Sequence, residues 1–286
     1  MTRSFASTMR LSLAAAGTAL REKLAYRFNY LGSMLTYAVF ILVFSRIWAN
    51  SVAANGPIAG YSYSMLVWYF IIAELPMFAL GRFFWTLSRD MKSGQITYSI
   101  SRPYDYAGYQ YFERMGSAMP NLLLIGIEGF ALGLAITGGL PAIPSLEQAG
   151  TAAGNGATLA AGTARIALVL VSLLLSGTLN FYLQFSISLT ALWFEENDAF
   201  YWIYQKIALV VGTLIPIEFL PATVLRIAVW TPFPYVSYAP ARIMALFSYG
   251  EAFRLIAFQL GWILVSIVIA KLVFAAGSKR ISVNGG

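Results

Sequence analysis

Four polar side chains stand inside long apolar stretches, where they could act on a solute or a proton. Glu74 and Glu128 each interrupt such a stretch, and Asn180 and Gln184 are four residues apart, which places them on one helical face. A carboxylate within a bilayer is costly unless it is paired, protonated or hydrated. The glutamates could therefore contact cargo, relay protons, or form structural pairs with arginine; the arginine candidates are Arg82, Arg114 and Arg165. Asn180 and Gln184 suit hydrogen bonding between helices or contact with a substrate.

Covalent chemistry has little support in this composition. Cysteine and histidine are both absent, which excludes disulfides, Cys/His zinc sites, haem ligation by these residues, and Ser-His or Cys-His catalysis. A P-loop is also missing, because Leu272 stands where its first glycine belongs ahead of Gly277-Ser278-Lys279. We expect no catalytic residue, metal or cofactor in this chain.

The composition is that of a membrane protein. Of 286 residues, 59% are hydrophobic and 11% are charged, whereas soluble domains carry about 25% charged residues. A crossing helix needs about 20 mostly apolar residues. We expect an all-α polytopic fold with six transmembrane helices, near residues 29–48, 61–80, 116–138, 166–194, 201–219 and 254–275.

Charge distribution sets the expected orientation. Most of the 19 Lys and Arg residues fall before the first span, between spans two and three, and at the carboxyl terminus. These regions should face the cytoplasm, with both termini inside. The net charge of +7 then reflects membrane topology, and we expect no nucleic-acid partner. The Gly/Ala-rich segment 138–164 would be a flexible connector on the opposite face.

Two cytoplasmic elements show helical periodicity. Residues 1–28 predict a basic amphipathic helix along the membrane surface, with a secretory signal as the alternative. In the loop 82–115, one predicted helical face carries Phe83, Leu87 and Met91, and another carries Arg82, Thr86, Arg89 and Ser93. Gly94, followed by Gln95, should end this helix. It could dock onto a soluble partner or only anchor the loop.

Prolines break the region 216–240 too often for another crossing. Pro216, Pro221 and Pro232 belong to this set, which predicts a re-entrant helical hairpin. Glu218 and Phe219 lie at its start. Glu218 could belong to a gate or a substrate exit, or it could cap a helix amino terminus.

Several motifs, in order, resemble ABC-2 type permeases, the membrane subunits of ATP-driven exporters, and most closely their drug-exporter-like branch. Ser93-Gly94-Gln95 followed by Arg102-Pro103 resembles the SGQ…RP element of that family. Leu24 to Asn29 is similar to the segment leading into the first span. The prolines of 216–240, with Pro216-Ile217-Glu218-Phe219-Leu220-Pro221, resemble the re-entrant region between spans five and six.

The resemblance implies that 1–286 is one transmembrane domain and that residues 82–94 are a coupling helix for separate nucleotide-binding subunits. ATP and Mg²⁺ would be bound by those subunits, and a second permease chain, identical or homologous, would complete the pore among membrane lipids. The expected activity is export of a hydrophobic or amphipathic substrate, drug-like or lipid, by alternating access across a bacterial inner membrane. The alternative is a proton-coupled secondary transporter that uses Glu74 and Glu128.

Overall fold

The computed structural model describes residues 29–79, 81, 83–96, 105–144 and 155–284, with Ala14, Gly17, Thr18 and Arg21 ahead of them. Within these residues the regular elements are helices, apart from an isolated bridge between Ile58 and Tyr61. The longer α-helices are α2 (Asn29–Asn55), α3 (Tyr63–Ala79), α6 (Tyr106–Thr137), α8 (Asn155–Leu189) and α12 (Tyr249–Asn284). The shorter ones are α4 (Phe84–Lys92), α9 (Asp198–Val210), α10 (Ala222–Ala228) and α11 (Pro234–Ala245), with 3-10 turns η2 (Thr190–Leu192) and η3 (Ile217–Phe219).

In the described part of the chain, five helical stretches are long and apolar enough to cross a membrane. They are Leu31–Asn55, Tyr63–Lys92, Tyr106–Thr137, Thr158–Leu192 and Tyr249–Lys279. This supports the predicted all-α polytopic membrane protein. Five of the six expected spans coincide with these stretches.

The expected fifth span, 201–219, falls on a short helix. α9 has 13 residues and ends at Val210, so at 1.5 Å per residue it is about 20 Å long. That is less than the roughly 30 Å of hydrocarbon in a bilayer. The chain then turns at Gly212, whose φ of 100° favours glycine. The count of six spans therefore stays a prediction.

Two long helices begin well before their apolar cores. α6 starts at Tyr106, where the Asp105 carboxylate accepts a hydrogen bond from the Gly108 amide at 2.8 Å. α8 starts at Asn155, so residues 155–164 of the expected connector 138–164 are helical. That part of the connector prediction is wrong, and the alanines there, which favour helix, are the physical reason.

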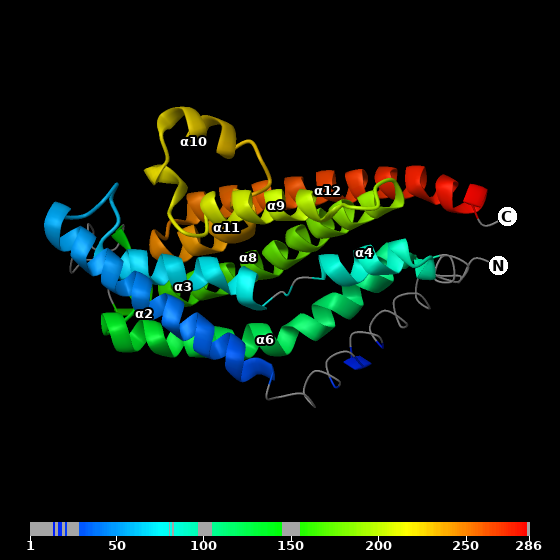
Figure 1. The fold of residues 1–286 in the computed structure, drawn as a ribbon. Coiled ribbons are helices and arrows are strands. Elements are labelled where there is room, and N and C mark those ends of the chain that lie inside the picture. Colours follow the sequence, from blue (N-terminus) through cyan, green and yellow to red (C-terminus); the bar gives the residue numbers. More distant parts are fainter. Residues whose placement is uncertain are drawn as a thin grey trace.

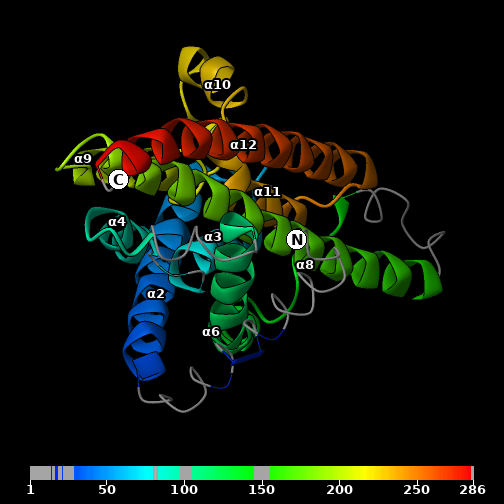
Figure 2. The same cartoon turned by 90° about the vertical axis from the view of Figure 1, so that its right-hand side faces the viewer.

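α8 and α12 lie side by side, and in Figure 2 they run across the direction of α2 and α6 (Figures 1 and 2). α4, the start of α6 and the end of α12 lie at one end of the bundle, and the junction of α2 with α3 lies towards the other. α10 stands off the bundle, beyond α12 in Figure 2. The region 216–240 thus comprises a protruding helix, α10, and the start of a packed one, α11.

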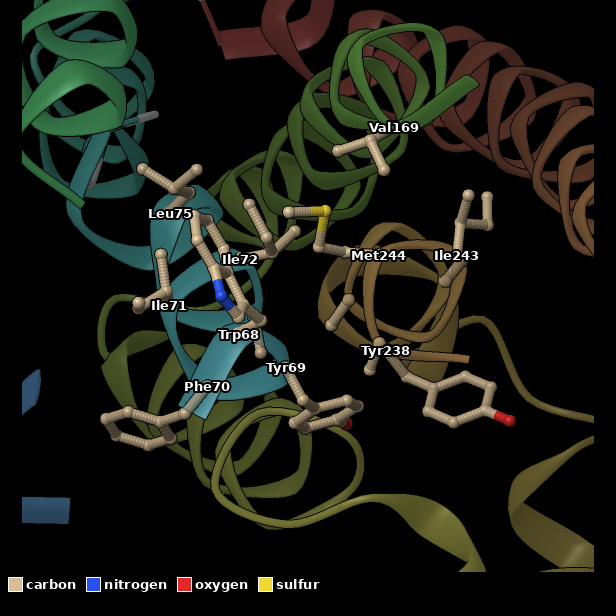
Figure 3. Packing of buried hydrophobic residues seen from close by; sticks show 14 of the residues in the cluster. Trp68, Tyr69, Phe70, Ile71, Ile72, Leu75, Val169, Tyr238, Ile243 and Met244 are labelled. Carbon is tan, nitrogen blue, oxygen red and sulfur yellow. The ribbon is translucent and has the colours of Figure 1, made fainter. Parts of the chain in front are cut away.

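The main core forms where α3 and α11 meet α8. Met244 of α11 lies near Ile72 of α3 and Val169 of α8 (Figure 3). Tyr69 projects from α3 beside Tyr238 and donates a hydrogen bond to the Gly212 carbonyl at 2.6 Å. The turn after α9 is therefore held against α3.

Glycines let α6 approach α2 and α3 closely. A Cβ on Gly133 would lie 2.7 Å from the Trp68 ring, and one on Gly129 would lie 2.5 Å from the Tyr37 hydroxyl. Trp68 is fully buried and donates to the Gly139 carbonyl at 2.9 Å. Small residues four apart are a common means of close helix packing in membranes.

Candidate functional site

α4 is the short amphipathic helix predicted in the loop 82–115. Its apolar residues Phe83, Leu87 and Met91 are 5%, 0% and 4% exposed, because they pack within the chain in a cluster that includes Phe181, Phe185 and Ala270. The opposite face is exposed and polar; it carries Thr86, Arg89, Lys92 and Ser93. The helix ends as predicted, since Gly94 has a φ of 74° and its amide donates to the Met91 carbonyl at 3.3 Å.

Polar contacts join α4 to α8 and α9. The Phe84 amide donates to Gln184 Oε1 at 3.3 Å, and Ser88 Oγ donates to Asn197 Oδ1 at 2.8 Å. The Phe84 ring stacks on Tyr201 with centroids 4.5 Å apart and an interplanar angle of 7°. α4 is therefore attached both to α8, before the turn between α8 and α9, and to the start of α9, after it.

Asn180 and Gln184 extend this connection into the bundle. Gln184 Nε2 donates to Asn180 Oδ1 at 3.0 Å, and the same oxygen accepts from the Tyr204 hydroxyl of α9 at 2.5 Å. Both side chains are buried and have partners. We call the chain of contacts from Phe84 through Gln184 and Asn180 to Tyr204 the α4 relay.

A shallow cavity of about 460 Å³ borders the outer face of α4. Arg89 and Lys92 line it on one side, and Asp198 at the start of α9 lines it on another. Glu195 and Glu196 are exposed in the adjoining turn. The outer face of α4 therefore combines basic residues with a neighbouring acidic loop.

Glu218 lies at a second polar cluster, at the start of the proline-rich region. Its carboxylate accepts hydrogen bonds from Tyr238 at 2.8 Å and Tyr61 at 3.3 Å, and lies 3.0 Å from Arg242 Nε. The Tyr61 side chain, which donates one of these bonds, is fully buried. We call Glu218, Arg242, Tyr61 and Tyr238 the Glu218 cluster. It joins η3, α11 and the segment before α3.

The interpretation of Glu218 as a helix cap is wrong. Pro221 precedes α10 with no side-chain cap bond, and the contacts of the Glu218 carboxylate are to side chains. Pro216 and Pro221 flank η3 with extended ψ angles of 140° and 143°. Phe219 packs edge-on against Trp48 and Tyr61.

The region continues into α11 through a second proline turn. The carbonyl of Pro232 accepts the Tyr235 amide at 3.2 Å where α11 begins. The residues expected at a gate thus belong to one folded region.

Tyr37 of α2 lies between the helices that carry Glu74 and Glu128. Its hydroxyl donates to the Ile71 carbonyl of α3 at 2.7 Å, and a Cβ on Gly129 of α6 would lie 2.5 Å from it. Glu74 Oε1 and Glu128 Oε2 are buried without a hydrogen-bond partner among the described residues. The expected pairing with Arg114 or Arg165 is not seen, since neither ion pair of the described residues includes them; these pairs are Glu218–Arg242 and Glu251–Arg254.

Some expected elements lie outside the described residues. They include Arg82, the Arg102-Pro103 dipeptide and most of the helix predicted for 1–28. The sequence analysis also missed partners that the structure brings in, namely Tyr61, Asn197, Tyr204 and Arg242. Arg242 carried a signal, a charge in an otherwise apolar segment. The tyrosines carried none beyond their abundance.

Comparison with known proteins supports the resemblance. Residues 149–285 match the family model described as ABC-2 family transporter protein. The match supports the resemblance to ABC-2 type permeases over α8 to α12. No curated protein matches the chain.

Proposed function

We propose that this chain is the transmembrane subunit of an ATP-driven exporter and that α4 couples it to separate ATPase subunits. The observation that supports this best is the build of α4: its apolar face is buried against the chain, while its basic, polar face is exposed. A helix held in this way can transmit force from a docked partner. Phe83, Leu87 and Met91 would hold the helix, and Thr86, Arg89, Lys92 and Ser93 would meet the ATPase.

The relay supplies a route for that force. Because Phe84 is bonded to Gln184 and stacked on Tyr201, displacement of α4 pulls on both α8 and α9. α9 leads directly into Gly212 and the Glu218 cluster. ATP binding at the partner would thereby reach the region 216–240, where Glu218 and Phe219 would act at a gate.

The proposed function also includes a cargo, an assembly and a cellular location. Two permease chains, identical or homologous, would enclose the path in a bacterial inner membrane, with both termini cytoplasmic. A hydrophobic or amphipathic substrate, such as a drug-like molecule or a lipid, suits spans that offer few charges to a polar solute. ATP and Mg²⁺ would be bound by the ATPase subunits.

The experiment reverses the charge of the outer face of α4. The Arg89→Glu/Lys92→Glu variant should lose most of the ATPase activity that co-purifies with the tagged chain from its own membranes, because two cationic contacts become repulsive. Arg226→Glu, an exposed arginine on α10, is the control and should keep it. Equal co-purification with all variants would contradict the role of α4.

The proton-coupled alternative rests on Glu74 and Glu128, each of which has one buried carboxylate oxygen without a partner among the described residues. Under it, the Glu74→Gln/Glu128→Gln variant would abolish transport driven by a pH gradient in liposomes that contain this chain alone. Under our proposal the chain alone transports nothing uphill, with or without these carboxylates.

A further inference from the structure

A large cavity lies at the beginning of α8, away from α4 and the Glu218 cluster. Its volume is about 1020 Å³, just above the roughly 300–1,000 Å³ typical of ligand sites. The walls come from the segment after α6 and from the first turns of α8. They include Leu140, Ile143, Leu159, Ile166 and Leu170.

One buried cation stands in this apolar wall. Arg165 is 2% exposed, and its Nη1 donates to the Pro141 carbonyl at 2.6 Å. Its Nε is buried without a hydrogen-bond partner among the described residues, and the ion pairs found there do not include it. A buried guanidinium with a single carbonyl partner lacks its counter-charge.

The position of Arg165 indicates the kind of anion. Arg165 is seven residues beyond Thr158, the first residue of the apolar stretch of α8, or about 10 Å along the helix. Beside it, Leu159 and Leu170 are 71% and 56% exposed and face the cavity. A ligand there meets a cation at one point and hydrocarbon elsewhere.

We propose that this cavity binds an anionic amphiphile, an apolar chain with a phosphate or carboxylate headgroup held by Arg165. The headgroup accepts a hydrogen bond from the Arg165 Nε–H, and the apolar chain lies over Leu159, Ile166 and Leu170. Charge-assisted hydrogen bonds of this kind are the stronger ones in proteins. The site belongs to this chain alone, so it does not depend on the proposed ATPase partner.

Native mass spectrometry of the purified full chain tests the proposal. Dioleoylphosphatidylglycerol should be retained about tenfold more than dioleoylphosphatidylcholine, and Arg165→Gln should remove that difference. Arg226→Gln deletes an exposed positive charge and is the matched control, with unchanged retention. Equal retention of the two lipids by the unmodified chain would overturn the proposal.

A second variant fills the cavity without touching the arginine. A Cβ on Gly162 meets nothing within 4 Å, so Gly162→Leu should fold and should block phosphatidylglycerol. If Arg165→Gln fails to fold, Gly162→Leu alone tests the site. Retention of phosphatidylglycerol by this variant equal to that of the unmodified chain would refute the site. Retention of oleate, measured in the same way, distinguishes a fatty acid from a phospholipid as the source of the headgroup. Retention of inorganic phosphate equal to that of phosphatidylglycerol would refute the need for an apolar chain.

The chain's own carboxylate Glu147 is the competing counter-ion, and it lies outside the described residues. Glu147→Gln should leave lipid selectivity intact. A gain in phosphatidylglycerol retention by Glu147→Gln would show that Glu147 pairs with Arg165 in the unmodified chain and would overturn the proposal.

Discussion

Replacing Gln184 by leucine should weaken the attachment of α4 to the bundle while leaving the bundle folded. Leucine is similar in volume, so the site stays filled, but both relay hydrogen bonds of Gln184 are lost. Asn180 keeps its bond from Tyr204, whereas the Phe84 amide, on a residue with no exposed surface, loses its acceptor. The damage is therefore concentrated at the start of α4.

The magnitude follows from these contacts. A net hydrogen bond contributes about 1 kcal/mol, and a buried donor left unpaired costs about 1–3 kcal/mol. The Gln184–Asn180 bond lies within α8, so the attachment of α4 should weaken by the cost of the unpaired Phe84 amide, about 1–3 kcal/mol. This raises the population of the detached form about 5- to 150-fold. The stacked rings of Phe84 and Tyr201 remain, so the helix itself should persist.

Hydrogen exchange measures the effect directly. Amides of residues 84–92 should exchange faster in Gln184→Leu, by up to the same factor, while those of α3 stay protected. In liposomes with the ATPase partner, ATP turnover should persist while transport per ATP falls. Gln110→Leu is the control, because Gln110 is buried on α6 and its Oε1 has no partner in the part of the chain that the structure describes. The same exchange at α4 in both variants would refute the relay.

Two further substitutions test the packing that surrounds the site. Glu218→Gln should lower thermal stability in detergent by about 1–3 kcal/mol, since it weakens contacts to a partly buried arginine. In the double variant Glu218→Gln/Arg242→Gln the loss should be smaller than the sum of the two single losses, and strict additivity would contradict the ion pair. Gly133→Ala should cost about 1–3 kcal/mol, because its Cβ would lie 2.7 Å from the Trp68 ring. Gly126→Ala, on the same helix with open space at Cβ, should cost nothing, and equal melting of the two variants would argue against the close approach.

Hydropathy located the long helices but not their ends. The apolar windows place α2, α3 and α12 well because those helices are apolar along most of their length. α6 and α8 begin in polar or small residues, where capping and propensity decide, so their starts were missed. The sequence around α9 predicts a span because apolar residues continue past Val210, although the helix ends at that residue.

Periodicity identified the two faces of α4 but could not say what covers each. The spacing of Phe83, Leu87 and Met91 is equally suited to a partner's groove and to the chain's own core. In the structure these three residues pack within the chain's own core. Tyr61 and Glu218 are separated by 157 positions, and their contact depends on tertiary packing that no local pattern encodes.

α8 connects the two polar clusters physically. Near its end it bonds α4 through Gln184, and nearer its middle Ser172 and Ser176 bond Gln259 of α12. Gln259 Nε2 also donates to the Tyr235 carbonyl of α11 at 2.9 Å, so α8, α11 and α12 meet at one side chain. Because α11 carries Arg242 of the Glu218 cluster, a shift of α4 has two bonded routes to that cluster, one through α9 and one through α8. A packed interior transmits strain between discrete arrangements, so these shared contacts support the proposed role, in which a partner moves α4 and the Glu218 cluster responds.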